Sequence, residues 1–213
     1  MFRSFIVVMF AFCCGGFAFA QSEVTLDIAG VTLEMNPVEA QTIAEKKGYE
    51  IASSDGVMKG PTFEEFVEIQ QKTRAEKLKL TASEAIVHRL NLTKSDSPDE
   101  TIQIDFLSMP QGPVMFSVTY KNETEGLSFD DFLPLAKEKY GEVEKLGSSK
   151  KALWYNLPLQ KTGRAPLEAQ TLELNGRRSY IRLILKSSEA YLNFNTAVKE
   201  KKEAEAKKHK PTF

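Results

Sequence analysis

Apolar residues alternate with polar ones along several stretches of this 213-residue chain, a pattern typical of strands with one buried face. The clearest stretches are TIQIDFL (101–107) and VMFSVTY (114–120), which the turn at 110–113 connects as a hairpin. Further strands are expected through Val24, Leu26 and Ile28 and at 49–52, 142–146, 151–157, 169–174 and 179–186. Residues 84–94 also alternate as a strand would, although 81–84 could instead begin a helix.

Three other segments carry the signals of helix ends. Asn36 and Glu39 are spaced as a capping box before a helix that Gly48 ends. Thr62 begins a second helix, which is expected to run to about Lys79. The third helix is the most regular, with apolar residues at helical spacing from Phe129 to Tyr140. Helices are therefore expected at 37–47, 63–79 and 129–140.

The order of these elements predicts an α+β fold in which helices pack on one face of an antiparallel sheet. We expect one domain over 21–194, followed by a charged and flexible tail over 195–213. A short echo links GVTL before the first helix with GLSF before the third. It suggests two related halves, 21–120 and 121–194, although a chance match explains the echo equally well.

The first 20 residues have the order of features found in a secretory signal peptide. Arg3 precedes an apolar run, and Ala18 and Ala20 provide the small residues before a cleavage site. The alternative is a membrane anchor, but the run is shorter than the ~20 residues needed to span a bilayer and contains two glycines. We therefore expect a periplasmic or secreted protein whose mature chain has no transmembrane segment.

Composition removes several classes of function. Cys13 and Cys14 are the only cysteines and both lie in the signal peptide, so the mature chain would have neither a disulfide nor a thiol site. The chain has 28 basic and 29 acidic residues, and the signal peptide holds one of the basic ones. A nearly neutral mature chain argues against a nucleic-acid partner, which would require a marked basic excess.

The residues capable of acid–base chemistry do not form a recognisable catalytic motif. His88 stands alone in the sequence, and His209 lies in the lysine-rich tail. Neighbouring carboxylates such as Asp130 and Asp131 point about 100° apart on a helix, so they do not share one site. The sequence also contains no metal-ligand spacing or phosphate-binding glycine loop, so we predict no catalytic, metal or cofactor residues.

Trp154 and Tyr155 are the two candidate interaction anchors. As neighbours in a strand they face opposite sides of the sheet, so one is expected in the core and the other at the surface. Trp and Tyr dominate the energetics of many protein interfaces. The alternative is that both side chains are covered by the protein itself.

One motif resembles a known group of exported bacterial proteins. Gly30-Val31-Thr32-Leu33-Glu34-Met35 before a helix is similar to the helix start in the SmpA/OmlA and β-lactamase-inhibitor-protein-like group, and LAKEKYG at 135–141 is similar to a helix end in exported proteins. The resemblance implies helices on an antiparallel sheet and a role in envelope assembly or protein binding. The chain departs from the group at Lys47-Gly48-Tyr49, where a Leu-Gly-x-Pro sequence is usual.

These observations lead to one principal hypothesis and two alternatives. We expect an exported, non-enzymatic protein that binds another protein or a small ligand in the bacterial cell envelope. The first alternative is a periplasmic hydrolase that uses convergent carboxylates, with or without His88. The second is a proteinaceous inhibitor, which would expose an aromatic-rich concave sheet.

Overall fold

A computed structural model describes residues 26–53, 55–77, 83–123, 125, 128–147, 150–154, 166–174 and 178–208. The expected signal peptide, with Ala18 and Ala20, therefore lies outside the described residues, as do Tyr155 and His209. The helices are α1 (Pro37–Lys46), α2 (Phe63–Gln71), α3 (Arg74–Lys77), α4 (Phe129–Tyr140) and α5 (Ser188–Lys208). The strands are β1 (Tyr49–Ile51), β2 (Val57–Gly60), β3 (Ile86–Lys94), β4 (Ser97–Met109), β5 (Gly112–Asn122), β6 (Lys145–Gly147), β7 (Lys151–Trp154), β8 (Leu167–Leu174) and β9 (Arg178–Lys186).

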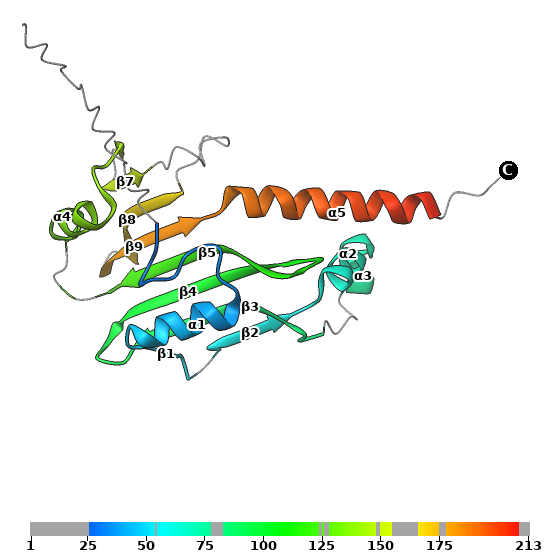
Figure 1. Cartoon of the computed structure of the whole chain (residues 1–213), viewed down its shortest axis with the longest axis horizontal. Coiled ribbons are helices and arrows are strands. Elements are labelled where there is room, and N and C mark those ends of the chain that lie inside the picture. Colours follow the sequence, from blue (N-terminus) through cyan, green and yellow to red (C-terminus); the bar gives the residue numbers. More distant parts are fainter. Residues whose placement is uncertain are drawn as a thin grey trace, which may run out of the picture.

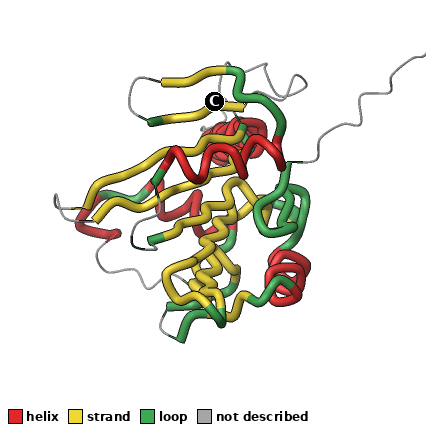
Figure 2. Tube along the Cα trace, turned by 90° about the vertical axis from the view of Figure 1, so that its left-hand side faces the viewer, coloured by secondary structure: helices red, strands yellow, loops and turns green. Residues whose placement is uncertain are grey.

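In this part of the chain all nine strands join one antiparallel sheet, so the predicted α+β class is confirmed (Figure 1). The strand order is β1-β3-β4-β5-β9-β8-β7-β6, and β2 also pairs with β3 next to β1. Figure 2, turned by 90°, shows the strands running through the molecule with helices set against them. The ambiguous segment 84–94 is a strand from Ile86 onward, as the alternation favoured.

The strand order divides the sheet into two runs. Helix α1 precedes β1 to β5, helix α4 precedes β6 to β9, and the last strands of the two runs pair with each other in the middle of the sheet. Val118 of β5 stands opposite Leu185 of β9 at this junction. Two related halves would require such an arrangement, although a common origin of 21–120 and 121–194 stays a prediction.

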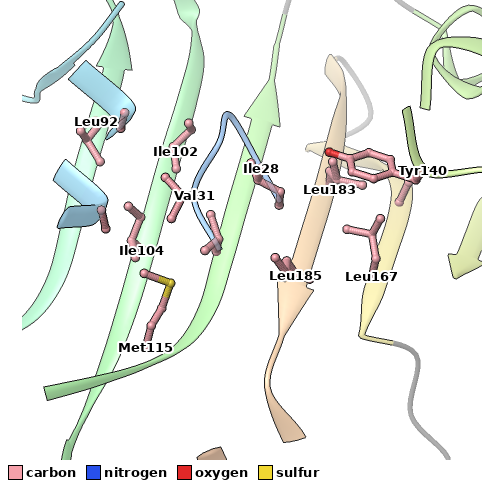
Figure 3. Close-up of a cluster of buried hydrophobic side chains, with 14 of the residues drawn as sticks. Ile28, Val31, Leu92, Ile102, Ile104, Met115, Tyr140, Leu167, Leu183 and Leu185 are labelled. Carbon is pink, nitrogen blue, oxygen red and sulfur yellow. The ribbon is translucent and has the colours of Figure 1, made fainter. Parts of the chain in front are cut away.

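The main hydrophobic core lies on one face of the sheet and continues across both runs. Directly opposed residues in antiparallel strands point to the same face, so the register defines rows of side chains that cross the sheet. Figure 3 shows Ile102, Ile104, Leu183 and Leu185 projecting from this face together with Leu167. Two such rows are Leu90–Ile104–Val118–Leu185–Leu167–Trp154 and Leu92–Ile102–Tyr120–Leu183–Ala169–Ala152.

The strand expected through Leu26 and Ile28 is replaced by a tight turn, so that prediction was wrong in the described residues. Ile28 and Val31 exchange backbone hydrogen bonds of 3.0 and 2.9 Å across Ala29 and Gly30, which have φ angles of 52° and 81°. Positive φ reverses the chain within two residues, which an alternating apolar pattern does not reveal. The turn inserts the buried side chains of Ile28 and Val31 into the core in front of the sheet (Figure 3).

Helices α1 and α4 cover this apolar face, and both begin as the sequence predicted. Asn36 accepts hydrogen bonds from the N–H groups of Val38 and Glu39, and the Glu39 carboxylate accepts from the N–H of Asn36. Ser128 and Asp131 form the equivalent capping box in α4. The buried helix residues that join the core are Ala40, Ala44, Phe129, Ala136 and Tyr140.

A second apolar cluster joins α2 and α5 to the end of the β4–β5 hairpin where the turn connects the two strands. Phe194 of α5 packs on Phe63 and Phe66 of α2, with ring centroids 6.4 and 5.2 Å apart, and Met109 of β4 completes the cluster. The helix predicted to reach Lys79 is two helices, because α2 ends at Gln71 and α3 starts at Arg74. Residues 195–208, expected as a tail, continue α5 past the sheet (Figure 1).

Candidate functional site

The face of the sheet opposite the main core is lined by polar side chains, and we call it the polar face. Most of these residues are half-buried. The polar face consists of the rows Arg89–Asp105–Ser117–Lys186, Asn91–Gln103–Thr119–Ile184–Glu168–Leu153 and Thr93–Thr101–Lys121–Arg182–Gln170–Lys151, in which Ile184 and Leu153 are the apolar members. It extends from β3 to β7 and crosses the junction between the two runs of strands.

A row of cations occupies the middle of the polar face. Lys121 of β5 stands directly opposite Arg182 of β9, Arg182 stands opposite Gln170 of β8, and Gln170 stands opposite Lys151 of β7. We call these four residues the cationic row. Like charges directly opposite each other destabilise a sheet, so the other contacts of these cations decide how much of the repulsion is relieved.

Both lysines of the cationic row have a carboxylate partner on the same face. Lys121 forms an ion pair with Glu123 and its Nζ lies 4.6 Å from the ring centroid of Tyr180. Lys151 Nζ lies 2.9 Å from Glu168 Oε2. The side chains of Lys121 and Lys151 remain 34% and 35% exposed, so these pairs stay within reach of solvent.

Arg182 has a neutral partner instead. The Gln170 amide oxygen is assigned to the side of Arg182, because the opposite orientation would place the NH₂ donors against the guanidinium; in this orientation it accepts a hydrogen bond from Nε at 3.1 Å and another from Nη2. Among the side chains that the structure describes, no carboxylate lies within ion-pair distance of Arg182. Arg182 therefore lies between two lysines in the row. Unlike theirs, its positive charge is not balanced by a neighbouring carboxylate in the described part of the chain.

Asp105 forms a compact polar node beside the cationic row. Its carboxylate accepts hydrogen bonds from Arg89 Nε at 2.5 Å, Gln103 Nε2 at 2.8 Å and Ser117 Oγ at 3.1 Å. Asp105 is only 7% exposed, whereas the Arg89 side chain is 39% exposed. The buried carboxylate thus has three donors and anchors an arginine at the surface of the polar face.

His88 lies beside a serine at an irregular position of β3, but their hydrogen bonds do not suit nucleophilic catalysis. His88 Nε2 is 3.0 Å from Ser108 Oγ and 3.2 Å from the carbonyl oxygen of Pro61, and Ser108 Oγ donates to that same carbonyl at 2.8 Å. Since a carbonyl only accepts, it favours a protonated Nε2. A base that activates serine needs an unprotonated nitrogen, so this trio holds the β2–α2 connection in place.

Glu100 is the other carboxylate with several polar neighbours. It accepts a hydrogen bond from the Tyr120 hydroxyl at 3.1 Å and lies 3.3 Å from Lys94 Nζ, with the Tyr49 hydroxyl at 3.5 Å. Burial, together with the charge of Glu100, raises the pKa of Tyr120 to about 12 and also raises the pKa of Tyr49. Both tyrosines therefore act as neutral donors at ordinary pH.

Trp154 is the buried member of the pair of candidate anchors. It is 3% exposed, its ring centroid lies 6.0 Å from that of Tyr140, and its Nε1–H donates to the Gly141 carbonyl at 3.0 Å. This side chain leaves no surface for a partner. Any interaction role of Tyr155 stays a prediction because the residue lies outside the described part of the chain.

Two further searches concern metals and membranes. Within the described ranges, no three His, Cys, Asp or Glu side chains gather in a way that could hold a metal ion. None of the helices described here combines the length and apolar character needed to cross a bilayer.

The signal for the polar face was present in the same alternation that predicted the strands. Between the buried positions of TIQIDFL lie Thr101, Gln103 and Asp105, and the next strand has Ser117 and Thr119 at its corresponding positions. Which of them face each other depends on the strand order, and in particular on the β5–β9 pairing.

Comparisons with other proteins add no relative to this geometry. No family model, curated protein or solved structure matches the chain. The candidate site is therefore defined by its own residues, namely the polar face and the cationic row at its centre.

Proposed function

We propose that this chain is an exported, non-enzymatic protein that binds another protein of the bacterial cell envelope through the polar face. The observation that carries the proposal is the cationic row, in which Lys121 and Arg182 stand opposite each other on a half-exposed sheet surface. A second observation is that the main core lies on the other face, while the apolar cluster of α2 and α5 covers the end of this face beyond Asp105, where Leu107, Met109 and Val114 lie.

The size of the polar face favours a protein over a small ligand. Sites for small molecules are usually concave and mostly apolar, with a few convergent polar groups. Here the accessible groups are spread over β3, β4, β5, β9, β8 and β7, and most are charged or amide side chains. Such a surface is suited to a partner that also presents an extended polar surface.

The geometry of His88 gives no support to the hydrolase alternative, since its described contacts are a carbonyl and a hydroxyl that already donates elsewhere. The inhibitor alternative required an aromatic-rich sheet face. Tyr180 contributes an aromatic ring next to the cationic row, but Tyr120 and Trp154 lie on the core face. A partner-binding role through polar contacts is therefore the function we propose.

Site-specific photocrosslinking tests this proposal. A photoreactive residue would replace Thr119 on the polar face of the mature protein, and a matched control would carry it at Val38, which is 73% exposed on α1 over the apolar face. Both proteins would be incubated with an envelope extract of the source organism. We expect a discrete crosslinked product from position 119 alone, which an excess of unmodified protein abolishes. Equal products from both positions, or none from position 119, would contradict the proposal.

A further inference from the structure

We infer that the cationic row binds an acidic segment of the partner, and that a carboxylate of this segment neutralises the positive charge of Arg182. This inference rests on the proposed function and names the chemistry of the partner. It assigns Arg182 as the central contact and Lys121, Gln170 and Lys151 as its neighbours.

Arg182 lies directly across the β5–β9 ladder from another cation, Lys121. The Cα atoms of Lys121 and Arg182 are opposite each other in the β5–β9 ladder, which places them about 5 Å apart. Like charges directly opposite each other in a ladder are unfavourable, and Glu123 pairs with Lys121 rather than with Arg182. An incoming carboxylate at Arg182 would relieve the repulsion that the folded chain retains.

Further donors lie beside Arg182 in the same row. With its amide oxygen turned to Arg182, Gln170 has its NH₂ group directed away from the guanidinium. A guanidinium binds a carboxylate in a fixed fork geometry, which makes arginine well suited to this contact. Lys151 lies two strands from Arg182, about 10 Å away, so a second carboxylate of an extended segment could reach it.

The polar face also carries carboxylates. Glu123 and Glu168 already pair with the two lysines, and Asp105 pairs with Arg89, so Arg182 and the exposed Lys186, opposite Ser117, make up a small excess of positive charge on the face. A nucleic acid neutralises many cations at once and is bound by surfaces with a large basic excess. Two cations without a described carboxylate partner, Arg182 and Lys186, are better suited to a few carboxylates of a protein.

The probe for this inference is a fluorescent glutamate decapeptide, with a glutamine decapeptide and a thymidine oligonucleotide of equal length for comparison. Anisotropy would be measured on the mature protein and its variants at low and at added salt. We expect the wild-type protein to bind the glutamate peptide and neither of the other two probes. Arg182→Gln should weaken this binding by about tenfold, which is the typical effect of losing one contact to a charged group. The control is Lys59→Gln, which changes an exposed lysine of β2, outside the polar face.

Urea unfolding of Arg182→Gln would show that the variant is folded. Equal binding of the glutamate peptide by wild type and Arg182→Gln, the absence of peptide binding, or tighter binding of the oligonucleotide would overturn the inference. If the protein does not bind the glutamate peptide but the photoreactive residue at position 119 still captures a partner, the inference of an acidic segment is wrong and the proposed function stands. If binding of the glutamate peptide depends on Arg182 while position 119 captures nothing, the cationic row binds carboxylates as inferred, but the proposal of an envelope partner is contradicted.

Discussion

Lys121 and Arg182 face each other across the β5–β9 ladder, the one pairing that joins the two runs of strands. On the opposite side of the same two strands, Val118 and Leu185 form part of the main core. The junction that unites the sheet therefore also creates the cationic row. A single structural feature accounts for both the continuity of the core and the position of the candidate site.

The buried carboxylate of Asp105 should be important for stability. In Asp105→Ala, the donors on Arg89, Gln103 and Ser117 lose their acceptor at a site that is only 7% exposed. Breaking a fully buried ion pair costs several kcal/mol, but Arg89 can turn toward water, so we expect a loss of about 2 kcal/mol. Urea unfolding monitored by circular dichroism would measure the loss.

Thr119→Ala provides the comparison, because Thr119 is half-buried on the same face in the next row. Its effect on the free energy of unfolding should stay within about 0.5 kcal/mol. If Asp105→Ala is as mild as Thr119→Ala, the polar node does not stabilise the fold as described.

The continuous core predicts that the two runs of strands unfold together. Ile104 of β4 is fully buried, and its row reaches Leu167 and Trp154 in the second run. Ile104→Ala should cost about 3 kcal/mol through lost burial and the cavity it leaves. Because Trp154 is the single tryptophan, its fluorescence would monitor the second run.

We expect the fluorescence transition of Ile104→Ala to move to lower urea by the same amount as the far-UV signal. A fluorescence midpoint that stays at the wild-type value while the far-UV midpoint moves would show that the two runs fold as separate units.

Stability should decline at alkaline pH because of Tyr49, Tyr120 and Tyr140. Burial is the main reason that their folded pKa values are raised above the ordinary 10.0, to about 12 for Tyr120. A raised folded pKa stabilises the protein fully below pH 10, and this contribution is lost as the pH rises toward 12. Thermal unfolding between pH 8 and about 12, with absorbance at the tyrosinate band, would measure it.

Tyr120→Phe should make this decline less steep, since one of the titrating groups is removed. Full ionisation of all six tyrosines near pH 10 in the folded protein, with no change in stability, would contradict the assigned burial.

The contact between Gly60 and His88 predicts a non-additive pair of substitutions. A Cβ at Gly60 would lie 2.9 Å from His88 Cδ2, and the ring is held by Pro61 and Ser108. Gly60→Ala should therefore destabilise the protein, and much less so when His88→Ala is also present, with a coupling of about 1 kcal/mol. Additive effects in a double-mutant cycle would show that the ring does not press on this position.

The helix starts and the central hairpin could be predicted from sequence because their determinants are local. Asn36 with Glu39 and Ser128 with Asp131 are three residues apart, and the alternation in β4 and β5 needs no partner to be recognised. The turn at Ala29 was missed since positive φ at a non-glycine residue leaves no trace in an apolar pattern.

The candidate site could be predicted only in part, because it depends on pairing between distant segments. The alternation in VMFSVTY implies that Thr119 faces away from the core, yet nothing local indicates that Arg182 stands beside Lys121. Trp154 was singled out for its residue type, and its burial follows from α4, which places Tyr140 and Gly141 against it. Contacts between segments that are remote in sequence, rather than residue type, determine which side chains can meet a partner.

The most direct test of the binding surface is a titration of the isotope-labelled mature protein with the glutamate decapeptide, followed by amide chemical shifts. We predict that the largest shifts map to Lys121, Lys151, Gln170 and Arg182 on the polar face. Shifts that instead map to α1, which lies over the opposite face, or to the lysines of α5, would contradict a binding role for the cationic row.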